Sequence, residues 1–210
     1  MLKIITSGAF AAALEKILPL FAQKNNITYE LSYGSSFGEA NDSIPSRIKK
    51  KEHFDIYFLA EGAINRHHEE GILDIKTKHN IVSSEIGVAV KNGSNLYDIS
   101  SLESFKDTLI SSKSIGYAAS ASGIYLANTV FPKIFNDPDV IFKKSKKILS
   151  ERVGSVIFRG DIEIGFQQYS ELLPIKEIKI IGMLPKEIRK SFIFGSAMSN
   201  NSKFEAIYIN

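Results

Sequence analysis

The first 75 residues alternate between short apolar strands and amphipathic helices, and this alternation limits the fold more than any other feature of the chain. Strands are predicted over 2–6, 28–33 and 54–60, and helices from residue 9, from residue 43 and over 61–70. Ser43 followed by Pro45 is typical of a helix start, and Gly71 of a helix end. Strands that alternate with helices predict a mostly parallel sheet covered by helices.

A second pattern of the same kind begins near residue 85. It has predicted strands over 86–90, 114–118 and 162–166, and predicted helices over 101–111, from 122 and over 151–158. We therefore expect an α/β fold with two lobes, formed by 1–84 plus 188–210 and by 85–187, with mixed sheets flanked by helices. The crossings near Ser84 and Lys186 are expected to act as hinges. A ligand cleft is expected between the lobes, at the carboxyl ends of parallel strands.

Composition supports this interpretation and excludes several classes of protein. The 210 residues are 44% hydrophobic, enough for real cores and too many for a disordered chain. Lys+Arg 26 against Asp+Glu 23 leaves a net charge of +3, which gives no support for a nucleic-acid partner. No apolar run approaches the ~18 residues of a membrane helix, so we expect a soluble protein with no direct membrane insertion. The absence of cysteine excludes disulfides, Cys-ligated metals and thiol nucleophiles.

The start of the sequence bears on its location. Met1-Leu2-Lys3 leads directly into an apolar strand, without a charged segment followed by a longer apolar stretch. We expect a periplasmic protein if a signal sequence was removed, and a cytoplasmic one otherwise.

Common catalytic and metal-binding patterns are missing. The chain has no Walker A, GxGxxG, HExxH or GxSxG motif. The run His67-His68-Glu69-Glu70 does not suggest a metal site, because neighbouring residues on a helix point about 100° apart and cannot converge on one ion. We expect no metal and no cofactor.

Small hydroxyl residues recur just after strands and just before helices. They are Ser7, the pair Ser35-Ser36, and Ser122 beside Gly123. Helix starts offer unpaired N–H groups and partial positive charge, and serine adds neutral donors, so such positions suit an anion. One serine alone is explained by helix capping. Three at equivalent strand ends favour an anion site.

Several longer stretches resemble a known family. The segments 114–126 and 160–174, supported by 86–90 and 182–185, are similar to type II periplasmic binding proteins, in particular the molybdate-binding proteins of ABC transporters. The resemblance implies two lobes that close on a small anion such as a molybdate-like oxyanion, no enzymatic activity, and an ABC transporter permease as partner. Family members continue with another helix beyond Asn210, which implies that the first lobe is incompletely covered.

The resemblance also implies a set of ligand-binding residues. It assigns this role to Ser7, Ser35 or Ser36, Ser122 with Gly123, and the backbone amide of Val153. The family's ligand-binding tyrosine falls on Gln168, and this difference argues against molybdate itself. Arg47 follows a loop longer than the family's. If Arg47 faces the cleft, its planar fork favours a small carboxylate, and otherwise it is a solvated helix residue.

Two further alternatives keep the fold and change the role. Enzymes with this architecture need a general acid or base, for which Glu61 or Glu171 would have to point inward. A cytoplasmic sensor of a small anion is the other alternative.

Overall fold

The computed structural model describes residues 1–94 and 97–204. It divides into two compact units, Met1–Ser83 with Phe192–Asn210 (unit 1) and Ser84–Ser191 (unit 2). The sequence places the lobe boundaries near 84 and 187, and the use of these crossings as hinges stays a prediction. Residues 205–210, on which the expectation of an incompletely covered first lobe depends, lie outside the described residues.

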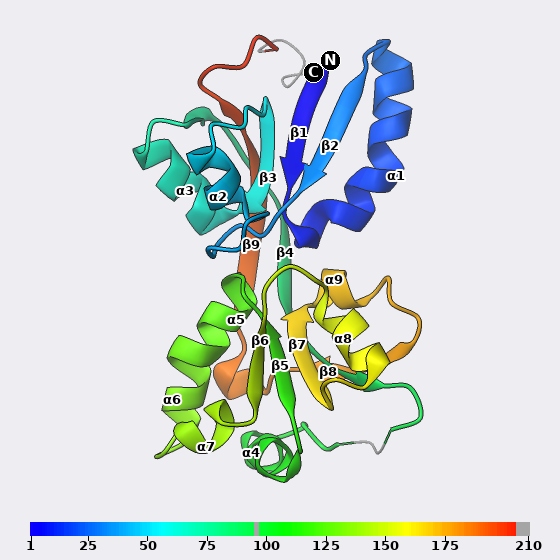
Figure 1. The fold of residues 1–210 in the computed structure, drawn as a ribbon, viewed down its shortest axis with the longest axis vertical. Helices are drawn as coiled ribbons and strands as arrows, with labels where there is room; N and C mark the ends of the chain where they lie inside the picture. Colours follow the sequence, from blue (N-terminus) through cyan, green and yellow to red (C-terminus); the bar gives the residue numbers. More distant parts are fainter. Residues whose placement is uncertain (95–96, 205–210) are drawn as a thin grey trace. The chain divides into compact units, whose positions relative to one another are not determined.

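Unit 1 is built on a mixed sheet that is covered on both faces (Figure 1). Its strands β1 (Leu2–Thr6), β2 (Tyr29–Tyr33) and β3 (Ile56–Ala60) are parallel, and β9 (Ser191–Ser199) joins β3 in the antiparallel direction. Helix α1 (Gly8–Asn25) lies on one side of this sheet, and α2 (Ile44–Lys49) and α3 (Glu61–Glu69) lie on the other. These elements confirm the predicted α/β pattern of the first 75 residues.

The core of unit 1 lies between the sheet and helices α2 and α3. Ile5, Leu59 and Ile64 are fully buried there. Burial of one such side chain stabilises the fold by about 1.5–3 kcal/mol. Phe10 of α1 packs edge-on against Phe58 and covers the opposite face of the sheet.

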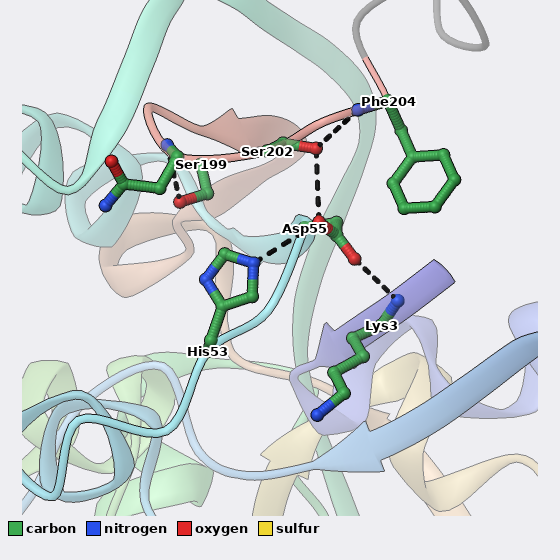
Figure 2. A network of polar contacts seen from close by, with 7 residues as sticks. Lys3, His53, Asp55, Ser199, Ser202 and Phe204 are labelled. Carbon is green, nitrogen blue, oxygen red and sulfur yellow. Dashed lines mark hydrogen bonds and ion pairs between the residues drawn. The ribbon is translucent and has the colours of Figure 1, made fainter. Parts of the chain in front are cut away.

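The buried carboxylate of Asp55 joins several segments at the end of the unit 1 sheet where its parallel strands begin (Figure 2). Asp55, just before β3, accepts hydrogen bonds from the Lys3 backbone N–H at 2.8 Å and from the Ser202 hydroxyl at 3.2 Å. His53 lies 3.4 Å from the same carboxylate. The Asp55 carbonyl also accepts from the Ser199 amide, so this one residue joins the first strand of the chain to the segment that follows the last strand.

Unit 2 contains a second mixed sheet. The long strand β4 (Leu73–Lys91) enters it and pairs antiparallel with β7 (Ile164–Gln168) and β8 (Ile178–Met183). Strand β5 (Ile115–Ala118) lies parallel between β7 and β6 (Ser145–Ile148). Its helical segments are α4 (Leu102–Ser111), α5 (Ala121–Tyr125), a π-helical segment (Leu126–Val130), α6 (Phe131–Ile134), α7 (Asp139–Phe142), α8 (Val153–Arg159), α9 (Tyr169–Leu172) and a 3-10 turn (Lys186–Ile188).

The sequence prediction missed part of the second half. Strand β4 is 19 residues long, whereas only 86–90 was predicted, because its first part is polar and exposed. Strand β6 has the sequence Ser-Lys-Lys-Ile with one buried residue, so its apolar pattern is too short to detect. Strands β8 and β9 were also not predicted. No described helix is both long and apolar enough to cross a membrane.

Candidate functional site

The carboxyl ends of β1, β2 and β3 bring the predicted serines of unit 1 to one edge of the sheet. The Ser7 amide, after β1, donates to the Phe58 carbonyl of β3 at 2.8 Å. The loop after β2 carries Ser35 and Ser36, and the Ser36 hydroxyl accepts from the Ala60 amide at the end of β3, at 3.1 Å. Local topology therefore gathers these serines as the sequence pattern predicts.

Ser7 is placed as a helix cap but does not act as one. It is the N-cap residue of the 18-residue helix α1, and its side chain makes no capping hydrogen bond. Ser7 is 4% exposed, and its hydroxyl has no hydrogen-bond partner among the described residues. A buried hydroxyl without a partner costs free energy, so its position at the positive end of a long helix needs an explanation other than capping.

Ser35 and Ser36 differ in what they can offer a ligand. The Ser35 hydroxyl donates to the Phe37 carbonyl at 2.6 Å, so its proton is already used. Ser36 is buried and accepts from Ala60, which leaves its own proton available. The two serines were alternatives in the sequence analysis, and the hydrogen bonding favours Ser36.

Arg47 points away from this edge. Its Nε lies 3.3 Å from the Glu52 carboxylate, and its guanidinium lies 5.5 Å from the ring centroid of Phe54. Glu52 and Phe54 precede β3, whereas Ser36 contacts the residue that ends β3. The guanidinium is therefore held at the opposite end of β3 from the serines. It is not a freely solvated helix residue either, since the side chain is 24% exposed.

At the carboxyl edge of unit 2, two polar side chains are fully enclosed. Ser122 has 0% exposure and lies in α5, which contacts β7. The N-cap of α5 is Ser120, not Ser122, and the two hydroxyls are 3.4 Å apart. Gln168 ends β7 and is 2% exposed, and both polar atoms of its side-chain amide lack a hydrogen-bond partner among the described residues.

Gly123 is required for packing rather than for access to a ligand. A Cβ built on it would collide with the Ala118 carbonyl oxygen and lie 2.9 Å from the Tyr117 ring. The absence of a side chain thus allows α5 to approach the end of β5 closely. The sequence interpretation, in which Gly123 lets the backbone approach an anion, gains no support from this geometry.

The amide of Val153 is already occupied. It donates to Gln167 Oε1 at 2.9 Å, and Gln167 Nε2 donates to a Glu171 carboxylate oxygen at 3.0 Å. The backbone N–H of Gln168 contacts the same carboxylate. Gln167 is not among the residues predicted from the sequence, although a polar residue at the end of a strand is a signal that could have indicated it.

The two carboxylates considered as general bases have opposite environments. Glu61 bonds Lys78 at 2.8 Å and Asn80 at 3.2 Å, and these bonds hold its pKa below the usual value. Burial raises the pKa of Glu171 to about 7, against the lowering effect of its bonds and of Arg152. Only Glu171 can exchange a proton readily near neutral pH.

The His67–Glu70 run does not form a cluster. His67 is buried and lies 2.7 Å from a Glu70 oxygen, and His68 contacts the Leu73 carbonyl. Within residues 1–94 and 97–204, no group of three His, Asp or Glu side chains is placed to hold a metal ion.

Comparison with known families gives the class of protein. The family model described as bacterial extracellular solute-binding protein matches residues 2–206, and the chain belongs to this family. The solved structures that resemble the chain include molybdate-binding and other periplasmic binding proteins, as expected for a type II periplasmic-binding-protein fold.

Individual relatives are named for different ligands or substrates. An aconitate isomerase of a Pseudomonas species is 29% identical over 202 residues, which cover 96% of this chain and 77% of the relative. The periplasmic molybdate-binding protein of Azotobacter vinelandii has a TM-score of 0.74 at 16% identity, with 98% and 88% of the two chains covered. PEB3 of Campylobacter jejuni with bound L-phospholactate has a TM-score of 0.70 at 13% identity, with 98% and 89% covered.

Proposed function

We propose that this solute-binding protein binds a small organic acid, held by neutral hydrogen-bond donors at the carboxyl edges of the strands. The carrying observation is Gln168, a buried side-chain amide with both of its polar atoms unpartnered. A buried amide in this state is costly unless a ligand completes its hydrogen bonds. Ser7 provides a second buried donor in unit 1, and Ser36 and Ser122 are further hydroxyls in the set.

The Gln168 side chain favours an organic acid over a molybdate-like oxyanion. Molybdate is fully ionised near neutral pH and only accepts hydrogen bonds. The amide offers an N–H₂ donor and a carbonyl acceptor, and the acceptor requires a donor on the ligand. An acid with a hydroxyl group or one retained proton supplies that donor. The relative named for aconitate also covers 96% of this chain at a higher identity than the molybdate-binding structure.

Titration calorimetry with citrate, trans-aconitate, lactate, molybdate and sulfate tests the proposal. We expect at least one organic acid to bind more tightly than both inorganic oxyanions. Each hydrogen bond to a charged group contributes about 1.5–3 kcal/mol, so Ser7→Ala and Gln168→Met should each weaken that acid roughly tenfold to a hundredfold. Preference for molybdate would contradict the proposal.

Isomerisation of an unsaturated acid is a second candidate function, favoured by one observation. Burial raises the pKa of Glu171 to about 7, and the group lies beside Gln168. A general base that moves a proton from one carbon to another needs such a pKa and such a position next to the ligand. We expect binding without turnover: proton NMR of cis-aconitate in D₂O should show no conversion or deuterium exchange above that in buffer. Protein-dependent conversion that Glu171→Gln abolishes would establish the enzymatic role instead.

The transport role is part of the proposal. The family is described as extracellular, and several of the similar structures belong to ABC transporters, so we propose an ABC transporter permease as the partner. Fractionation of cells that express the chain at natural levels tests the location. Recovery in the cytoplasm alone would instead favour the alternative role of a cytoplasmic sensor of a small anion.

A further inference from the structure

We propose that Gln167 and Glu171 belong to the anion site of unit 2, and that Glu171 takes up one proton when an anion binds there. The inference rests on the proposed function and names a regulation of the same site. Gln167 is 4% exposed at the end of β7, next to Gln168. Its amide bridges the Val153 N–H and the Glu171 carboxylate, so the three groups form one chain of hydrogen bonds.

The orientation of the Gln167 amide depends on the protonation of Glu171. An ionised Glu171 only accepts, so Gln167 must turn its N–H₂ towards it and its carbonyl towards Val153. A protonated Glu171 can donate to the Gln167 carbonyl instead. The amide then turns over, and the Val153 N–H loses its acceptor and becomes available to an anion. Protonation of Glu171 therefore frees the Val153 N–H, which is otherwise bonded to Gln167, to donate to an anion.

Charge favours the same direction. An incoming anion repels an ionised Glu171, and this repulsion is stronger at a partly buried group than at a fully solvated one. Burial already raises the pKa of Glu171 to about 7, so a modest further rise protonates the group at neutral pH. Among the charged groups near α9, Arg152 before α8 acts on Glu171, Arg159 of α8 is paired with Glu151, and Lys179 of β8 is exposed. Strand β7 has no charged residue. Strand β4 also packs against α9 through Gly87, and its Glu85 lies 3.7 Å from Arg189 while its Lys91 lies over the Phe158 ring.

A purely structural role for Glu171 is the alternative. Glu171 lies in the first turn of α9 and contacts the backbone N–H of Gln168, the N-cap residue, as a helix-capping glutamate does. Capping alone would make the variant less stable. It would not make anion binding take up protons.

The test is calorimetry of lactate and of malate, two hydroxy acids that stay ionised from pH 6.5 to 8, in buffers of different ionisation enthalpy. We expect an uptake of up to about one proton per bound anion, and a Kd that rises by up to about tenfold per pH unit. Glu171→Gln should abolish both effects, and Glu151→Gln, a surface carboxylate of the same unit paired with Arg159, should abolish neither.

The outcomes separate the two proposals. Tight binding of either anion without proton uptake overturns the inference and leaves the binding function intact. Failure of both anions and of the other acids to bind overturns the proposed function, and the inference with it. If Glu171→Gln does not fold, Gln167→Met serves instead: it removes the bridge, and its pH dependence should fall to less than half that of the parent protein. An unchanged dependence would contradict the role of Gln167.

Discussion

The carboxyl edge of unit 1 and that of unit 2 both present buried polar groups, but their chemistry differs. Unit 1 offers hydroxyls, with Ser7 unpartnered at the start of a long helix. Unit 2 offers an amide that both donates and accepts, and beside it the titratable Glu171. The difference teaches that, under the proposed function, anion affinity and anion choice would reside in different parts of one chain: the hydroxyls of unit 1 would suit any small anion, whereas the amide and Glu171 of unit 2 would discriminate by hydrogen-bond donors and protonation.

The largest expected effect is a loss of stability in unit 2. Gly123→Val places a branched side chain against the Ala118 carbonyl, a backbone atom that cannot move freely, and should destabilise the protein by about 3 kcal/mol or more. Gly62→Ala in α3 of unit 1 is the matched control, because its Cβ would meet only the Phe37 ring at 3.7 Å. That change should be neutral or stabilise by up to about 1 kcal/mol. Thermal unfolding measures both, and equal stability of the two variants would refute the packing role of Gly123.

Replacement of the discriminating amide should affect binding and spare the fold. Gln168→Met removes two unpartnered buried polar atoms, so the free energy of unfolding should stay the same or rise. Affinity for the organic acid that the calorimetric panel identifies should fall roughly tenfold to a hundredfold. The same substitution at the exposed Gln23 of α1 is the control and should change neither quantity. Unchanged affinity in Gln168→Met would contradict the proposal that unit 2 discriminates between anions.

The corresponding change in unit 1 should be smaller and less selective. Ser7→Ala should weaken all binding anions by about tenfold, because one neutral donor is lost. Stability should change by less than about 0.5 kcal/mol, since Ser7 makes no capping bond. In contrast, Ser43 caps α2 through the Ser46 amide, and Ser43→Ala should cost about 0.5–2 kcal/mol without a change in affinity. If Ser7→Ala is as destabilising as Ser43→Ala, Ser7 is a cap after all.

The last prediction concerns stability without ligand. A carboxyl whose pKa is raised to about 7 on folding stabilises the protein fully below the ordinary glutamate pKa and loses this contribution as the pH rises through 7. Denaturant unfolding should therefore show that the Glu171 contribution decreases between pH 5.5 and 8. The difference between the parent and Glu171→Gln should shrink over this range. A difference that grows with pH would mean that Glu171 is stabilised as a carboxylate.

Sequence patterns predicted the first three strands better than the later ones. The first three strands alternate with helices that have recognisable starts and ends, such as Ser43 with Pro45, and these local signals match the elements found. The missed strands lie in both units: β6 of unit 2 is short and rich in lysine, and the first part of β4, which belongs to unit 1 up to Ser83, is largely exposed. Whether such segments form strands depends on pairing with strands that are distant in the sequence, and a local pattern cannot show that pairing.

The places of the candidate residues could be inferred from the sequence more readily than their contacts. Ser7 and Ser36 follow strands, so their place at one sheet edge could be inferred from topology. The direction of Arg47 could not, because its partners Glu52 and Phe54 were not identifiable as such from sequence. The bond from Val153 to Gln167 likewise joins residues 14 positions apart and requires the structure.

The position of β9 has a consequence for the order in which the chain folds. Strand β9 lies between β3 and β4 in the sheet, and Asp55 ties the residues after it to β1. The sheet of unit 1 therefore lacks a central strand until residue 199 has been synthesised, whereas unit 2 is one continuous segment, Ser84–Ser191. Although domains of nascent chains usually fold from the N-terminus onward, here the second unit can complete its fold before the first. During that interval the edges of β3 and β4 stay unpaired, and a nascent unit 1 is the part of the molecule most exposed to aggregation.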